Sequence, residues 1–248
     1  MLKIRSLALL PLLLATATAS AQHGGDLQAQ IVYAFETEDP HQLADLIQEL
    51  RTQVKSGGAD SSLRYHLAHA QYRFGRLVGQ NRPHEAESAF ADCVDQLKAV
   101  LEQDVKSVEA MALQSACYSE LAGFRKIEAV ILRSRAADRL NAASKLAPRN
   151  PRVVFLSATD GLTRASPGSE QRQHAFAQLQ LAAQLFEQSS STSPDAPGWG
   201  HAEAYLALGR EMESRGDRLG ARNWIEKSLI AAPDFKAAQR QQALLLAH

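Results

Sequence analysis

The chain has 248 residues, and its 27 basic and 27 acidic side chains give a formal net charge of zero. Nucleic acids and anionic membrane surfaces attract basic proteins, so this balance gives no reason to expect either as a partner. Hydrophobic residues make up 45% of the chain and charged residues 22%, as in an ordinary globular protein. The length allows either one large domain or a string of repeats.

The N-terminus has the three parts of a secretory signal peptide. They are a basic start, a short apolar run and a small-residue cleavage site: Lys3 and Arg5, residues 7–15, and Ala19-Ser20-Ala21. The apolar run falls short of the roughly 20 residues that a membrane-spanning helix needs, and no later segment comes closer to that length. We therefore predict that residues 1–21 are removed and that residues 22–248 form the mature protein. The expected location is the periplasm of a Gram-negative bacterium, or the outside of the cell.

Clusters of Gly and Pro divide the rest of the chain into segments that favour helices. The segments are rich in Ala, Leu, Gln, Glu and Arg, and none shows the alternation of polar and apolar residues that is typical of a half-buried strand. We predict an all-α fold of five helical hairpins, followed by a short C-terminal helix after Asp234. In chain order, the hairpins are predicted over residues 27–55, 65–93, 108–148, 151–186 and 202–233.

The first four hairpins are predicted mainly from helical spacing. Pro40 opens the second helix of the first hairpin, where its missing N–H does no harm. In the second hairpin, Ala86, Phe90 and Cys93 fall on one face of a helix. The third hairpin is longer than the others, so we expect either extended helices or an enlarged turn around Gly123-Phe124.

The fifth hairpin has the clearest pattern. Its two helices each carry one face of small and apolar residues: Tyr205, Leu208, Gly209 and Met212 on the first, and Ala221, Ile225, Ser228 and Leu229 on the second. Gly216-Asp217 forms the turn between the helices, and Pro233 ends the second helix. Small residues at Gly209 and Ala221 let the two helices approach closely.

Residues 202–233 closely resemble the tetratricopeptide repeat (TPR), a helical hairpin of about 34 residues. Gly209, Ala221 and Pro233 stand at the offsets that the repeat requires, and residues 136–148 reproduce the pattern of its second helix. As a whole, the chain resembles the degenerate TPR proteins that Gram-negative bacteria export. The resemblance implies a TPR-like α-solenoid that binds a protein or peptide and has no catalytic activity.

The resemblance also implies a concave groove lined by the first helix of each hairpin. In the last repeat, this would place Glu203, Leu206, Arg210 and Glu213 in the groove. Mixed charge beside an apolar residue suits an extended peptide or a helix of a partner. The alternative is that these four residues are ordinary solvated side chains.

Two cysteines and one tryptophan leave alternatives open. Cys93 and Cys117 form a disulfide if the compartment is oxidising, or stay as two buried thiols. Trp199 precedes the last repeat, and it either pins the Ser-rich loop before it to the stack or anchors a partner.

Patterns that would indicate an enzyme are weak. His66 and His69 are three residues apart and are followed by His84 and Glu85, a set that could hold zinc, but two histidines on an exposed helix face are common. We therefore expect no metal, cofactor or catalytic residues. Three hypotheses follow: a scaffold that binds a protein or peptide, a structural subunit or assembly factor of a cell-envelope complex, and a metal-dependent hydrolase on a helical solenoid.

Overall fold

The computed structural model describes residues 15–56, 60–189 and 197–247, and it describes side chains from Asp26 onward. Within these ranges every regular element is an α-helix. The helices are α1 (Ala15–Glu36), α2 (Pro40–Ser56), α3 (Ser61–Val78), α4 (Pro83–Gln103), α5 (Val108–Phe124), α6 (Ala129–Leu146), α7 (Pro151–Arg164), α8 (Glu170–Ser189), α9 (His201–Ser214), α10 (Arg218–Ala231) and α11 (Lys236–Leu246). The predicted all-α class is confirmed.

Consecutive helices pair into five hairpins, from α1/α2 to α9/α10, and α11 follows alone. This is the arrangement that the punctuation by Gly and Pro predicts. Pro40, Pro83 and Pro151 each stand at the first position of a helix, where no hydrogen bond is lost. The third hairpin has the longer helices that were one of its two expected features: α5 and α6 have 17 and 18 residues against 14 each in α9 and α10. An enlarged turn around Gly123-Phe124 is not formed, because both residues belong to α5 and the turn follows at residues 125–128.

The turn of the fifth hairpin is built as its sequence indicates. Gly216 has φ of 81°, a left-handed conformation that side chains disfavour. Asp217 then caps α10, because its carboxylate accepts a hydrogen bond from the backbone N–H of Gly220. The chain therefore reverses within three residues and brings α10 back along α9.

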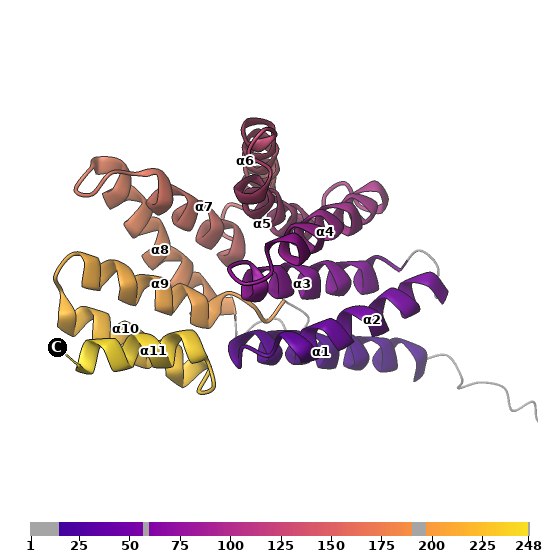
Figure 1. Cartoon of the computed structure of the whole chain (residues 1–248), viewed down its shortest axis with the longest axis horizontal. Coiled ribbons are helices and arrows are strands. Elements are labelled where there is room, and N and C mark those ends of the chain that lie inside the picture. Colours follow the sequence, from indigo (N-terminus) through magenta and orange to yellow (C-terminus); the bar gives the residue numbers. More distant parts are fainter. Residues whose placement is uncertain (1–14, 57–59, 190–196, 248) are drawn as a thin grey trace, which may run out of the picture.

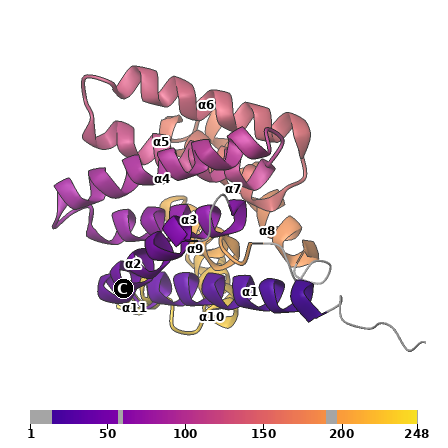
Figure 2. The same ribbon diagram turned by 90° about the vertical axis from the view of Figure 1, so that its right-hand side faces the viewer.

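The hairpins follow one another around a ring (Figure 1). Seen from the side, α6 and α1 lie at opposite limits of the first three hairpins, and in the last hairpin α10 lies near the level of α1 and α9 near that of α3 (Figure 2). The last hairpin and α11 thus return to the first one. Phe35 at the end of α1 packs in one apolar cluster with Leu206 of α9 and with Phe235 and Ala238 around the start of α11.

A disulfide joins the second and third hairpins. Cys93 of α4 and Cys117 of α5 are both fully buried, and their Cα atoms are 6.3 Å apart. The bond thus adds a covalent link where the second helix of one hairpin packs against the first helix of the next.

The predicted signal peptide remains a prediction. Residues 1–14 lie outside the described part of the chain, and the expected cleavage site falls in the first part of α1, where only the backbone is described. None of the described helices has the length and apolar content that crossing a membrane requires.

Candidate binding pocket

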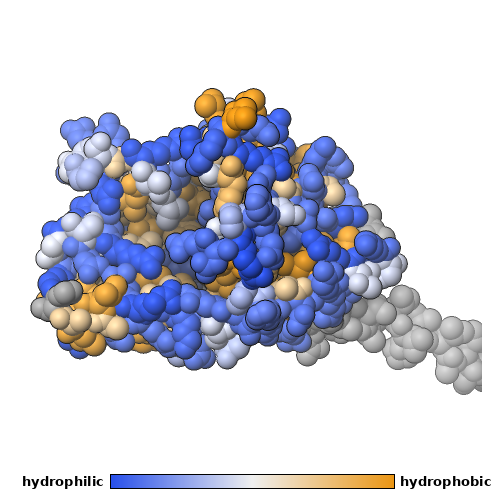
Figure 3. All heavy atoms as spheres, in the orientation of Figure 1, coloured by the Kyte–Doolittle hydropathy of each residue, from blue (hydrophilic) through white to orange (hydrophobic). Residues whose placement is uncertain are grey.

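The centre of the ring holds a pocket of about 1140 Å³. The first helices of the hairpins supply most of its walls, with further residues from α6, α8 and α11. Figure 3 shows the hollow on the face of the molecule, with apolar residues inside a hydrophilic rim. Sites for small molecules typically measure about 300–1,000 Å³, so this pocket has room for a larger ligand.

One wall of the pocket is largely apolar. Leu156 and Leu162 of α7 are partly exposed to it, together with Leu140 of α6 and Ala207 of α9. The more deeply buried Leu206 continues this wall on α9. Partly exposed apolar side chains of this kind gain free energy when a ligand removes them from water.

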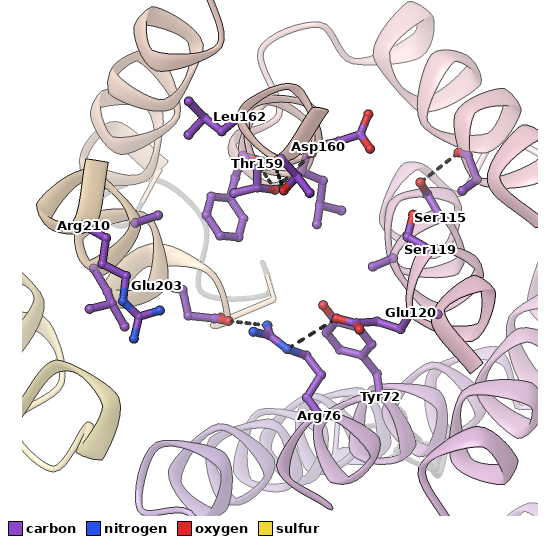
Figure 4. A pocket seen from close by; sticks show the side chains of 18 of the residues that line it. Tyr72, Arg76, Ser115, Ser119, Glu120, Thr159, Asp160, Leu162, Glu203 and Arg210 are labelled. Carbon is purple, nitrogen blue, oxygen red and sulfur yellow. Dashed lines mark hydrogen bonds and ion pairs between the residues drawn. The ribbon is translucent and has the colours of Figure 1, made fainter. Parts of the chain in front are cut away.

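The floor of the pocket is charged (Figure 4). Arg76 of α3 lies between two carboxylates, 3.3 Å from Glu203 of α9 and 3.6 Å from Glu120 of α5. Tyr72 lies beside Arg76, one helical turn earlier on α3. Burial raises the pKa of the Tyr72 hydroxyl, so this group stays neutral at physiological pH.

An almost completely buried ion pair closes the ring below this floor. Both terminal nitrogens of Arg73 donate to the carboxylate of Glu203, at 2.8 and 2.7 Å, and the Arg73 side chain is only 2% exposed. Arg73 Nε also donates to His69 Nε2 at 3.0 Å, and its guanidinium lies 4.2 Å from the ring centre of Phe35. Burial alone would raise the pKa of Glu203, but the charges of Arg73 and Arg76 hold it below its usual value.

Two more bidentate arginine–carboxylate pairs connect helices around the pocket. Arg152 of α7 donates to both oxygens of Glu109 on α5, at 2.6 and 2.8 Å. Arg172 of α8 does the same with Glu211 on α9, at 3.0 and 2.5 Å. Because the fork of an arginine matches a carboxylate in only a few orientations, these pairs fix the hairpins relative to one another.

Of the four residues predicted to line the groove, three line the pocket and one does not. Glu203, Leu206 and Arg210 line the pocket, but Glu203 is committed to the ring-closing ion pair. The expected position of Glu213 is wrong, because its carboxylate turns to α11 and accepts a hydrogen bond from Gln241 Nε2 at 2.5 Å. Glu213 lies beside the face of α9 that lines the pocket, next to α11. Partner binding by the other three remains a prediction.

The sequence suggested that His66 and His69 lie on an exposed face of a helix. In the structure both side chains are buried in α3. Burial and the neighbouring Arg73 lower the pKa of His69 well below its usual value, so its ring is neutral. Among the described residues, no group of three or more His, Cys, Asp or Glu side chains is placed to hold a metal ion.

Trp199 packs inside the molecule. Its indole Nε1 donates a hydrogen bond to the hydroxyl of Tyr65 on α3, at 3.1 Å, and its ring centre is 5.8 Å from that of His69. The chain before α9 is thereby attached to the second hairpin, which is the first of the two alternatives for this residue.

Sequence reasoning missed Arg73, Arg76 and Glu120. One signal was available for Arg76, which follows Tyr72 by four residues and therefore shares its helical face. No local signal exists for Arg73, because its partner Glu203 is 130 residues away in the chain.

No protein-family model matches the sequence, and no curated protein is significantly similar to it. Among solved structures, the chain is similar to TTC0263, a thermophilic TPR protein in Thermus thermophilus. The TM-score is 0.63 and the sequence identity 17%, over 92% of this chain and 100% of that one. At this identity the likeness shows the fold alone. The chain thus has a TPR-like, all-helical fold, as its sequence predicts.

Proposed function

We propose that this protein is an exported, non-catalytic scaffold that binds a peptide segment of a partner protein in the central pocket. The TPR-like fold suggests a protein-interaction scaffold. The pocket is the observation that carries the finer proposal, because its size and its apolar wall beside a charged floor match a peptide better than a small metabolite.

Two observations support export. The N-terminal sequence has the pattern of a cleavable leader. Cys93 and Cys117 form a buried disulfide, and such bonds persist mainly in oxidising compartments. Intact-mass analysis of the protein from a fractionated bacterial host tests this point. Loss of residues 1–21 from a periplasmic product supports export, and an uncleaved product in the cytoplasm contradicts it.

Peptide binding is tested by selection from a random peptide library displayed on phage. Ser119 of α5 is exposed and lines the pocket, so Ser119→Trp fills part of the pocket without entering the core. Ser134 of α6 is also exposed but lies outside the pocket, so Ser134→Trp is the matched control. Selected peptides should bind the original protein and the control, and lose most of their affinity for Ser119→Trp. If the selected peptides bind both variants equally well, their binding site lies outside this pocket.

A second candidate function is that of a subunit in a larger envelope complex. Apolar atoms gather at the top of Figure 3, above α6. Val130 and Ile131 in the first turn of this helix, and Ile127 in the turn just before it, have exposed fractions of 79%, 58% and 101%. Exposed apolar residues at helical spacing are typical of a surface that a partner helix covers. Val130→Asp should release such a partner from the purified complex while leaving peptide binding in the pocket intact.

A further inference from the structure

The acidic side chains that line the pocket all have arginine partners, but some of the arginines that line it have no carboxylate partner among the described residues. Five carboxylates line it: Glu38, Glu120, Asp160, Glu203 and Glu211. Each of them lies within ion-pair distance of at least one arginine of the chain. The acidic groups of the pocket are therefore already neutralised by the protein itself, and they have little charge left for a ligand.

Two of the arginines that line the pocket have no carboxylate partner within the described residues. Arg133 of α6 and Arg210 of α9 make no ion pair with any carboxylate in the part of the chain that the structure describes. Among the described residues, the one hydrogen bond that the Arg210 guanidinium donates runs from Nε to the amide oxygen of Gln241, at 3.1 Å. Its two terminal nitrogens remain available for a ligand, and so does the whole guanidinium of Arg133.

The surroundings of Arg210 add to this excess of positive charge. Figure 4 places Arg210 on the α9 side of the pocket, above the floor formed by Arg76 and Glu203. Burial lowers the pKa of Arg210, and repulsion from Arg240 and Arg76 lowers it further, while the charge of Glu213 opposes this shift only in part. An anion beside Arg210 would offset this repulsion by attraction, whereas another cation would add to it.

We infer that the peptide bound in the pocket is acidic as well as apolar, with a carboxylate that accepts hydrogen bonds from Arg210 while its apolar side chains pack on Leu156 and Leu162. The planar fork of a guanidinium fits a carboxylate through two parallel hydrogen bonds. Arg133, on the α6 side, is placed to bind a second acidic residue of the same peptide. This inference rests on the proposed function and specifies the class of its ligand.

Three labelled peptides of equal length test the inference, with repeating Leu-Asp, Leu-Gln or Leu-Lys sequence, titrated with the purified protein by fluorescence anisotropy. Leu-Asp should bind most tightly, and added salt should weaken it, because salt screens the charges. Arg210→Gln should weaken Leu-Asp binding by about tenfold, the usual effect of losing a hydrogen bond to a charged group, and Arg133→Gln should weaken it further. Arg135→Gln, an exposed position of α6 outside the pocket, is the matched control and should change nothing.

The outcomes separate this inference from the proposed function. If Leu-Gln or Leu-Lys binds as well as Leu-Asp, or if Arg210→Gln binds Leu-Asp normally, the inference is overturned while peptide binding stands. If library-selected peptides bind in the pocket but Leu-Asp does not, the inference again fails alone. Failure of every peptide, including the library, overturns both. Circular dichroism melts of each variant ensure that lost binding reflects lost contacts, since a misfolded variant would also melt differently.

Discussion

Gly209 carries no side chain at the point where α9 and α10 touch. A Cβ atom there would lie 2.5 Å from Ile225 Cδ1, and Ala221 opposite is fully buried. Extra atoms at such a contact force the helices apart, and overpacking of this kind typically costs about 1–3 kcal/mol. Ala221→Leu should therefore lower the free energy of unfolding by that amount in urea titrations. Ala231→Leu, at an exposed position of the same helix, should leave it nearly unchanged. Equal effects would mean that α10 is packed differently.

Glu36, at the end of α1, is a carboxyl group that the fold holds in an unfavourable place. Burial is the main cause, and repulsion from Glu203 the second, of a pKa raised from 4.5 to about 7. Between these values the folded protein keeps a proton that the unfolded chain has lost. Its stability therefore falls as the pH rises through this window, and the loss is complete above pH 7.

Replacing Glu36 by a neutral group should remove this loss. Glu36→Gln should raise the melting temperature at pH 8 by a few degrees, the usual size of a change of about 1 kcal/mol, and should change it little at pH 5. Glu102→Gln, at an exposed position of α4, should show no such dependence on pH. A Glu36→Gln protein that gains as much stability at pH 5 as at pH 8 would show that Glu36 is ionised at both.

At the scale of the helices, the disulfide between α4 and α5 closes a loop with a sequence separation of 24. In the chain-entropy estimate, a loop of this length stabilises the folded state by about 3–4 kcal/mol. The double variant Cys93→Ala, Cys117→Ala should lose about that much in urea titrations and keep its helical circular dichroism. Non-reducing peptide mapping supplies the direct check. Two free thiols in protein purified from the periplasm would contradict the bond.

The helices and their pairing could be predicted because their signals are local. A proline at the start of a helix, as at Pro83 and Pro151, and apolar residues at a spacing of three or four each lie within one turn or one hairpin. The position of α11 could not be predicted in this way. It depends on contacts between Gln241 and two residues of α9, Arg210 and Glu213, about 30 positions earlier, and this is why Glu213 was wrongly expected in the groove.

At the scale of the whole molecule, the closure of the ring depends on pairs that are far apart in the chain. Arg73 and Glu203 are 130 residues apart, and Arg240 pairs with Glu38 over 202 residues. No periodic pattern relates such positions, so the sequence predicted an open groove with a correct set of hairpins. The pocket differs from that groove because its floor combines residues of the first hairpins with residues of the last.

We therefore expect that a substitution can open the ring of hairpins without unfolding the helices. Arg73→Ala leaves the carboxylate of Glu203, which is only 12% exposed, without its main partner, and breaking a buried pair in this way typically costs about 3–5 kcal/mol. Each hairpin packs mainly on its neighbours, so the hairpins should stay folded while the last one moves away from the first. The radius of gyration from small-angle X-ray scattering should increase, with circular dichroism nearly unchanged.

A matched control exists on α10, where Arg222 and Glu226 form an exposed ion pair. Exposed pairs contribute roughly 0–1 kcal/mol, so Arg222→Ala should alter neither the radius of gyration nor the stability measurably. Hydrogen exchange locates the change: in Arg73→Ala the amides of α9 and α11 should lose protection, and those of α4 and α5 should keep it. Uniform loss of protection along the chain would show that the hairpins do not fold independently of the closure. An unchanged radius with normal protection in α9 would show that Phe35, Phe235 and the Arg240–Glu38 pair suffice to hold the ring.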